Sequence, residues 1–246
     1  MKAIIFGGTT GMGRAVARRL VERGDSVFLL GRSEAELVRS AADLKARHPA
    51  QAEVGYALCD LEHPEGFAAA LDAADAALAG FDTVVVTAAL FATQDALEAD
   101  IELTRRLLTV DYAHTVVFCE HARKYLLARG GGRLAVFSSV AGDRGRKPVA
   151  LYGSAKAGLS LYLEALDHKF HAAGLNVLCV KPGFVKTGMT AGLKAPPFAG
   201  EPDQVARAVV RAMDKKKPVL YTPSMWALVM LVIRWLPRFV MRKIGF

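Results

Sequence analysis

Tyr152 and Lys156 are the residues whose types and spacing first suggest chemistry. They stand four positions apart in a stretch, 151–170, whose pattern predicts a long helix, so both side chains lie on one helix face. A free phenol holds its proton tightly near neutral pH because its pKa is about 10, but a nearby ammonium group favours the phenolate. The pair could therefore exchange a proton with a substrate oxygen. An exposed tyrosine beside a solvated lysine is the alternative.

Ser139 stands thirteen residues before Tyr152, directly after an apolar run that predicts a strand. Ligands of α/β proteins bind beyond the carboxyl ends of strands, so a serine at this position can face a bound substrate. Its hydroxyl could hydrogen-bond a substrate oxygen and stabilise the charge that develops there. We therefore predict that Ser139, Tyr152 and Lys156 form a catalytic group.

Seven short apolar runs, separated by longer helical patterns, would position these side chains. The runs cover residues 3–6, 27–30, 54–58, 83–86, 134–137, 177–180 and 219–221. Strands that alternate with helices predict βαβ units with right-handed crossovers. The expected fold is α/β, a single doubly wound parallel sheet of the Rossmann type with helices on both faces. The chain shows no repeat or long linker, so we expect one domain over residues 1–222.

A glycine-rich turn follows the first predicted strand and leads directly into a helical pattern. Glycines let a backbone turn tightly and approach a pyrophosphate, and a helix N-terminus offers free N–H groups to the phosphates. An ordinary glycine turn is the alternative. The residues predicted to bind the phosphates of a dinucleotide are Gly7, Thr9, Thr10, Gly11, Met12 and Gly13.

The end of the second predicted strand indicates which dinucleotide binds. Enzymes that use NAD place an acidic residue about twenty positions after the glycines to bind the ribose 2′-hydroxyl. Here Gly31 occupies that position, and Arg32 and Ser33 follow it. A guanidinium beside an uncharged site suits a 2′-phosphate. We therefore predict NADP(H) rather than NAD(H), with a solvated loop arginine as the alternative role for Arg32.

Together these segments resemble the short-chain dehydrogenase/reductase family. Four segments follow the order and spacing of that family: the glycines at 7–13, Ser139, Tyr152 with Lys156, and the run at 181–187. The resemblance implies hydride transfer between a nicotinamide and a ketone or secondary alcohol. Tyr152 would be the acid in reduction and the base in oxidation, and Lys156 would also hold the nicotinamide ribose. Further implied cofactor contacts are Asp60, Leu61, Ala88, Tyr152, Lys156, Pro182, Gly183, Val185 and Thr187, although Asp60 could instead cap a helix.

Two positions depart from the family pattern. Asp111 stands where the family usually has an asparagine, which is thought to hold a water that links the lysine to solvent. A carboxylate cannot donate a hydrogen bond unless it is protonated. We therefore count Asp111 among the catalytic residues and expect an altered pH dependence; a polar group within a helix is the alternative. The second departure, Thr87-Ala88-Ala89 in place of Asn-Ala-Gly, changes the hydrogen bonding beside the adenine.

Residues 223–246 predict an apolar and basic tail rather than a separate domain. Its apolar run is shorter than the roughly 20 residues that span a bilayer, and Arg234 interrupts it. Trp226 and Trp235 beside several basic residues suit an element that lies in a membrane interface. A cover for the substrate pocket or for a subunit interface is the alternative. The basic residues are Arg234, Arg238, Arg242 and Lys243.

The C-terminal half resembles the decaprenylphosphoryl-ribose 2-keto reductase type of this family. The resemblance rests on the segments 152–154, 156–159 and 236–238 with Arg242 and Lys243, and it implies a lipid-linked ketone as substrate. A long-chain 3-keto lipid would suit the same tail. A soluble enzyme for small carbonyl compounds and a non-catalytic NADP(H)-binding protein remain as alternatives.

The composition excludes several other classes of protein. The net charge of +8 suits a membrane surface, but no aromatic platform or motif accompanies the basic residues, so we expect no nucleic-acid partner. The three cysteines are far apart and lack metal-ligand spacing, which predicts reduced buried thiols, no metal site and a cytoplasmic location. The family resemblance implies a homodimer or homotetramer through the helices at 110–129 and 151–170.

Overall fold

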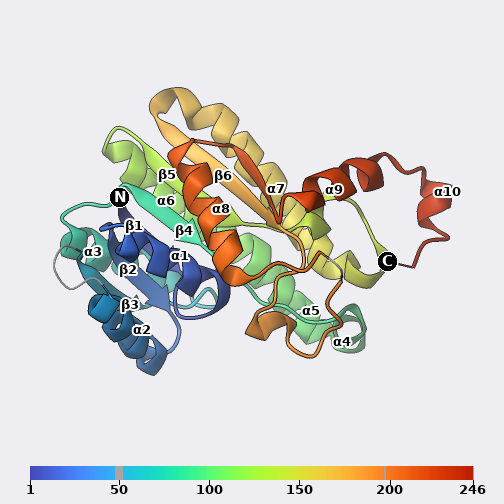
Figure 1. The fold of residues 1–246 in the computed structure, drawn as a ribbon, viewed down its shortest axis with the longest axis horizontal. Coiled ribbons are helices and arrows are strands. Elements are labelled where there is room, and N and C mark those ends of the chain that lie inside the picture. Colours follow the sequence, from blue (N-terminus) through green and yellow to red (C-terminus); the bar gives the residue numbers. More distant parts are fainter. Residues whose placement is uncertain (48–51, 197, 246) are drawn as a thin grey trace.

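A computed structural model describes residues 1–47, 52–196 and 198–245; Phe246, the last residue of the predicted tail, lies outside the described residues. Seven parallel strands form one sheet in the order β3-β2-β1-β4-β5-β6-β7 (Figure 1). All seven predicted strands are present, and the doubly wound fold is confirmed. The strands are β1 (Lys2–Phe6), β2 (Ser26–Gly31), β3 (Val54–Leu58), β4 (Thr83–Val86), β5 (Gly132–Phe137), β6 (Leu175–Pro182) and β7 (Val219–Thr222).

The helices cover both faces of this sheet because successive strand residues point to opposite sides. On one face Ile5 packs with α1 (Gly11–Glu22), α2 (Glu34–Arg47) and α8 (Pro202–Asp214). On the other face Ile4 and Phe6 pack with α3 (Phe67–Leu78), α6 (Thr115–Ala128) and α7 (Ala150–Phe170). Both strand faces are apolar, as a parallel sheet that is covered on both sides requires.

The order of the strands reverses at β1, which pairs with β2 on one side and with β4 on the other. Crossovers from the two sides leave in opposite directions, so a crevice opens beyond the carboxyl ends of β1 and β4. The residues that follow these two strands therefore face a common space. They are the glycine turn after Phe6 and the segment that starts at Thr87.

The segment between β4 and α6 is more irregular than the sequence suggested. It contains α4 (Gln94–Ala99) and α5 (Ile101–Leu108), and a π-helical turn (Thr109–His114) then leads into α6. The helix predicted at 110–129 is present, but its first turn is π-helical. Such turns occur often at functional sites, and this one contains Asp111.

The tail forms α9 (Met225–Trp235) and α10 (Arg238–Met241), which extend beyond one end of the sheet (Figure 1). Met230 and Ile233 are buried against Val140, so one face of α9 belongs to the body of the protein. The opposite face carries large exposed apolar side chains, which are Leu228, Leu231, Val232 and Trp235. Within the described residues, no helix combines the length and the apolar character that crossing a membrane requires.

Candidate active site

Ser139 occupies the turn that connects β5 to α7. Its Oγ accepts a hydrogen bond from the Ala141 N–H at 3.1 Å and so caps the short helical turn Val140–Asp143. This turn packs directly on α7, because a Cβ on Gly142 would lie 2.6 Å from the backbone carbon of Lys156. The neighbouring Ser138 fastens the same two elements by donating to the Lys156 carbonyl at 2.9 Å. These contacts bring Ser139 to the helix that carries the other predicted residues.

Tyr152 and Lys156 lie one turn apart on α7, as predicted. The Lys156 Nζ is 5.5 Å from the centre of the Tyr152 ring. The Phe91 and Tyr152 rings pack edge to face, with the ring centres 5.3 Å apart and the planes at 83°. Phe91 thus restricts the orientation of the phenol, a role that nothing in the sequence indicated.

Asp111 contacts the lysine directly. Its Oδ2 lies 3.0 Å from Lys156 Nζ, and both side chains are almost completely buried. Its Oδ1 accepts a hydrogen bond from the Leu90 N–H at 2.6 Å, which ties the π-helical turn to the segment after β4. The predicted catalytic residue Asp111 therefore lies in the same group as Tyr152 and Lys156.

The ionisation of these groups follows from burial and from their mutual charges. Burial favours the neutral phenol and raises the pKa of Tyr152; Asp111 acts in the same direction, and Lys156 and Ser139 act against it. Burial alone would lower the pKa of Lys156, but the Asp111 carboxylate outweighs it, so this pKa is raised and the ammonium stays charged. Burial raises the pKa of Asp111, and Lys156 opposes this rise.

The glycine turn forms a cradle with no space for larger residues. A Cβ on Gly7 would lie 2.6 Å from the Ala88 backbone nitrogen, and one on Gly13 would lie 2.2 Å from the Gly7 carbonyl oxygen. The Thr87 hydroxyl is 3.1 Å from the carbonyl oxygens of both Phe6 and Gly7, and it pins the turn to the end of β4. Thr87 thus forms a hydrogen bond in the segment where the sequence predicted a change in hydrogen bonding.

A cavity of about 180 Å³ lies between this cradle and the ends of β2 and β3. Arg32 is exposed at its rim, and Ser33 accepts a hydrogen bond from the Glu36 N–H at 3.4 Å at the start of α2. Asp60 accepts from the Glu62 N–H at 3.0 Å, so it caps a local turn while it also faces the cavity. The predicted cofactor residues that line this cavity are Gly7, Thr9, Thr10, Arg32, Asp60, Leu61 and Ala88.

The segment after β6 completes the site from the other side. Thr187 lies against the glycine turn, since a Cβ on Gly11 would be 3.5 Å from its methyl carbon. The Ser139 Oγ is 3.5 Å from the Pro182 carbonyl oxygen, and Val185 is buried beside these residues. Gly183 lies under the indole of Trp226, where a Cβ would be 2.1 Å from Nε1. No sequence pattern indicated this last contact.

The arrangement fits a bound dinucleotide. The cradle exposes backbone at the N-terminus of α1, where free N–H groups and the helix dipole favour phosphate oxygens. Met12 differs from the other predicted residues, because its side chain packs against the core. Apart from Tyr152 and Lys156 on α7, the remaining residues lie at or after the carboxyl ends of the strands, at one edge of the sheet. A nicotinamide dinucleotide held along this edge would have its reactive end beside Tyr152.

Comparison with known proteins assigns this arrangement to a family. Residues 1–197 match the short chain dehydrogenase family. The chain belongs to the short-chain dehydrogenase/reductase family. An uncharacterised oxidoreductase of Mycobacterium tuberculosis is 34% identical over 98% of this chain and 95% of its own length. The family is one of oxidoreductases that act on alcohol and carbonyl groups and use nicotinamide cofactors.

Two further relatives have names that state an activity, and one solved structure has the same fold. The cis-4-hydroxycyclohexanecarboxylate dehydrogenase of Sinomonas cyclohexanicum is 29% identical over 78% of this chain and 76% of its own length. Carbonyl reductase family member 4 of Xenopus tropicalis is 29% identical over 85% of this chain and 89% of its own length. A short-chain type dehydrogenase/reductase from Mycobacterium ulcerans superposes with a TM-score of 0.82 at 22% identity, covering 98% of this chain and 97% of that one.

Proposed function

We propose that this oxidoreductase uses NADPH to reduce a ketone group on a lipid-like or lipid-linked substrate to a secondary alcohol. The observation that carries the proposal is the meeting of Ser139, Tyr152 and a charged Lys156 beside the glycine cradle. A binding protein without catalysis would need none of these three side chains in this arrangement. The proposed roles follow from the chemistry of each group.

The bound nicotinamide would supply the hydride that reaches the carbonyl carbon. Tyr152 would donate its phenolic proton to the ketone oxygen as negative charge develops there. The Ser139 hydroxyl would donate a hydrogen bond to the same oxygen and hold the carbonyl in line with the phenol. Lys156 would stabilise the phenolate that the transfer leaves behind, and its remaining N–H groups would hold the ribose hydroxyls.

The preference for NADPH rests on the rim of the cavity at the end of β2. Gly31 provides no carboxylate for a ribose 2′-hydroxyl, and Arg32 beside it is exposed at the cavity. Within the described residues, no carboxylate forms an ion pair with the Arg32 guanidinium. A cation that is available in this way favours a 2′-phosphate.

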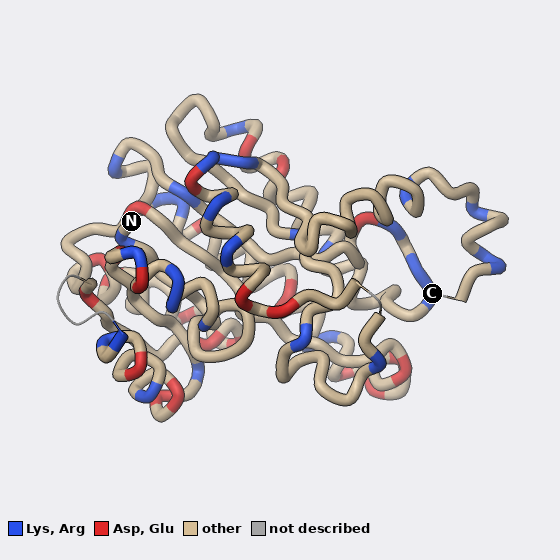
Figure 2. The backbone as a smooth tube through the Cα atoms, in the orientation of Figure 1, with Lys and Arg blue, Asp and Glu red and all other residues tan. Residues whose placement is uncertain are grey.

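The tail supports the proposal of a lipid-like substrate, because its exposed apolar surface is attached to the catalytic segment, the part of the chain between Ser139 and Tyr152. Arg144 donates to the Leu236 carbonyl at 2.8 Å and Lys147 donates to the Arg242 carbonyl at 2.7 Å. Both donors lie between Ser139 and Tyr152 in the chain. Basic residues recur along the tail, and no acidic residue follows Met225 (Figure 2). We propose that the tail contacts an anionic membrane surface, on the cytoplasmic side, where a lipid-linked 2-keto sugar or a 3-keto lipid could reach the site.

The proposal also includes a homodimer or homotetramer. The surface formed by the π-helical turn, α6 and α7 exposes three large apolar side chains, Tyr112, Val117 and Leu161. Two copies that pack these helices together would remove this apolar surface from water. Sedimentation of the purified protein measures the mass directly, and a monomer at micromolar concentration would contradict this part of the proposal.

The decisive test measures NADPH oxidation in detergent against a panel of ketones for the wild type and for Tyr152→Phe. The panel contains 2-keto lipid-sugars, long-chain 3-keto lipids and small cyclic ketones. We expect turnover of a lipid ketone by the wild type and a loss of about 100-fold or more in the variant, which keeps the ring but cannot donate a proton. NADPH binding should be equal in both proteins. Equal or faster turnover of the small ketones would assign a small carbonyl substrate instead, and no NADPH binding would contradict the cofactor assignment.

A further inference from the structure

Two buried charged side chains, Asp111 and Lys156, lie beside the partly exposed phenol of Tyr152. Asp111 comes from the π-helical turn, and Tyr152 and Lys156 come from α7. The exposed fraction of the side chain is 2% for Lys156 and 0% for Asp111, and the charged atoms are 3.0 Å apart. Water and salt screen such buried charges only weakly, so the pair acts strongly on the neighbouring phenol.

The net charge of this group decides how easily the phenol loses its proton. With Asp111 ionised and Lys156 protonated, the site is neutral as long as Tyr152 keeps its proton. Deprotonation then leaves an unbalanced negative charge in a buried site, which is costly. With an uncharged residue at position 111 and Lys156 still protonated, the same step would instead convert a positive site into a neutral one. Asp111 therefore opposes formation of the Tyr152 phenolate.

The other neighbours do not offset this effect. Ser139 approaches from the turn after β5 and favours the phenolate through a hydrogen bond, but it carries no charge. Cys179 approaches Lys156 from β6, and burial raises the pKa of this thiol, so it stays neutral. From the segment after β4 the contacts are the Phe91 ring and the Leu90 N–H, neither of which titrates. Burial and Asp111 together raise the pKa of Tyr152.

We propose that Asp111 is a positioning residue that keeps Tyr152 protonated across the neutral range and so adapts the site to ketone reduction rather than alcohol oxidation. This inference rests on the proposed function. In reduction the Tyr152 O–H bond breaks and its proton goes to the ketone oxygen, while hydride from NADPH forms the new C–H bond, so the ketone is reduced and NADPH is oxidised. Oxidation requires Tyr152 as a phenolate that accepts the proton of the alcohol. Asp111 thus separates the pH ranges in which the site reduces ketones and oxidises alcohols.

The substitution Asp111→Asn tests the role of this charge. Asp111 Oδ1 accepts a hydrogen bond from the Leu90 N–H, and Oδ2 forms an ion pair with Lys156 at 3.0 Å. The single amide oxygen of asparagine can still accept from Leu90, so the turn is kept, while the negative charge and the oxygen that faces Lys156 are lost. The amide nitrogen then faces the ammonium group, where it cannot act as a counter-ion.

The first readout is the titration of Tyr152 in the protein without cofactor or substrate. Tyrosine labelled with ¹³C at Cζ reports each of the six phenols, and the resonance that is absent in Tyr152→Phe identifies this one. We expect its pKa to fall by about one unit or more in Asp111→Asn. An unchanged or higher pKa would overturn the proposal.

The second readout is the pH dependence of turnover in both directions. In the wild type, alcohol oxidation should rise about tenfold per pH unit through the neutral range, because the phenolate fraction does so. In Asp111→Asn this rise should level off at a lower pH. The ratio of the kcat for alcohol oxidation to the kcat for ketone reduction at pH 7 should increase about tenfold. Profiles identical to those of the wild type would contradict the proposal.

Asp143→Asn is the matched control. Asp143 is also a buried carboxylate and its Oδ1 lies 2.6 Å from Lys181 Nζ, but it is not among the groups that act on Tyr152. We expect the Tyr152 titration to be unchanged in this variant, and an equal shift in both variants would show a general effect of lost charge. The titration needs no substrate, so an absence of turnover on every ketone would contradict the proposed function and leave this inference to be decided by the titration.

Discussion

Gly183 shows at the scale of one residue how the tail is fitted to the site. The Trp226 indole lies so close that a Cβ on Gly183 would be 2.1 Å from its Nε1, and the indole N–H donates to the Phe198 carbonyl at 3.3 Å. A methyl group at this position must displace the indole or the backbone. The glycine predicted to contact the cofactor thus also serves the packing of α9.

We therefore predict that Gly183→Ala destabilises the protein by about 1–3 kcal/mol, the usual cost of overpacking. Thermal unfolding of the wild type and the variant measures the difference. Gly188→Ala is the control, since a Cβ there meets nothing within 4 Å and the substitution should have little effect. Equal stability of the wild type and Gly183→Ala would show that the indole moves away without cost.

The second prediction for a single residue concerns Arg32. Arg32→Ala should weaken NADPH binding about tenfold or more, because charge-assisted hydrogen bonds to a phosphate contribute about 1.5–3 kcal/mol. NADH binding should change little, since it lacks the 2′-phosphate. Fluorescence titration with both cofactors measures the two affinities. Arg39→Ala, which removes another exposed guanidinium from α2, should leave both unchanged. A parallel loss for NADPH and NADH would refute the assigned role of Arg32.

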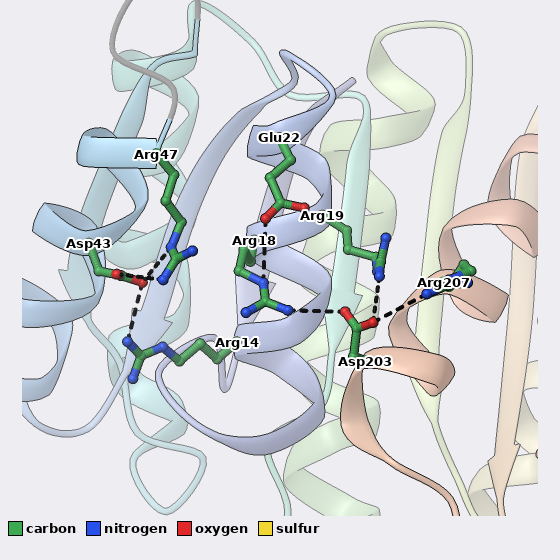
Figure 3. Close-up of polar contacts among 8 residues, drawn as sticks. All are labelled: Arg14, Arg18, Arg19, Glu22, Asp43, Arg47, Asp203 and Arg207. Atoms are coloured by element: carbon green, nitrogen blue, oxygen red, sulfur yellow. Dashed lines mark hydrogen bonds and ion pairs between the residues drawn. The ribbon is translucent and has the colours of Figure 1, made fainter.

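At the scale of elements, ion pairs attach the start of α8 to α1 (Figure 3). Asp203 in the first turn of α8 accepts from Arg18 at 3.1 Å and from Arg19 at 2.5 Å, and Arg207 on its own helix lies 3.5 Å away. The hydrogen bond from Arg19, followed by the other arginine contacts, lowers the pKa of Asp203 despite some opposing burial. Three arginines around one carboxylate form a network rather than an isolated surface pair.

This network predicts a stability that depends on pH. The pKa of Asp203 is lower in the folded state, so its contribution is complete above the unfolded pKa of about 3.9 and is lost as the pH falls through the folded value. Asp203→Asn should therefore be less stable than the wild type at pH 7, by about 1 kcal/mol because the groups are partly exposed. The difference should shrink below about pH 4.

Urea unfolding at pH 7 and at pH 3.5 measures both differences. Glu164→Gln removes an exposed carboxylate that forms no ion pair within the part of the chain that the structure describes, so it should match the wild type at both pH values. A deficit of Asp203→Asn that is equally large at pH 3.5 would mean that its charge is not the cause.

The elements also explain which parts of the molecule the sequence could predict. The strands were predictable because each is a short apolar run between helical patterns, and the glycine turn was predictable because its spacing is local. The π-helical turn at Asp111 was not, since no local pattern distinguishes it from the helix that it begins. The contacts of Thr87, Phe91 and Trp226 were not predicted for a related reason, because their partners are distant in sequence and only the folded chain brings them together.

At the scale of the whole molecule, the positive charge and the apolar side chains come together in the tail. One face of α9 is held against Val140, so the residues on its opposite face cannot also be buried in the same body. Arg144 and Lys147 connect this tail to the catalytic segment. A membrane that received the exposed face would therefore lie next to the side from which the proposed lipid substrate would approach.

The prediction is that the protein binds vesicles of phosphatidylglycerol and phosphatidylcholine through this face. The triple substitution Leu228→Ser, Leu231→Ser and Trp235→Ser should reduce binding at least about tenfold, because each large apolar side chain contributes about 1.5–3 kcal/mol when it leaves water. NADPH oxidation with a ketone in detergent should change far less. High salt should weaken binding of the wild type through screening of the basic residues.

Vesicle flotation measures this partition, and Ile101→Ser provides the control. Ile101 is 76% exposed on α5, close to the 78% of Trp235, but it lies outside the tail. If its loss reduced binding as much as the triple substitution does, general hydrophobicity rather than the tail would be responsible. Binding that is equally strong to vesicles without phosphatidylglycerol would exclude the basic residues as the contact to the headgroups. If the triple variant bound vesicles as the wild type does but sedimented as a smaller assembly, the exposed face of α9 would instead be a contact between subunits.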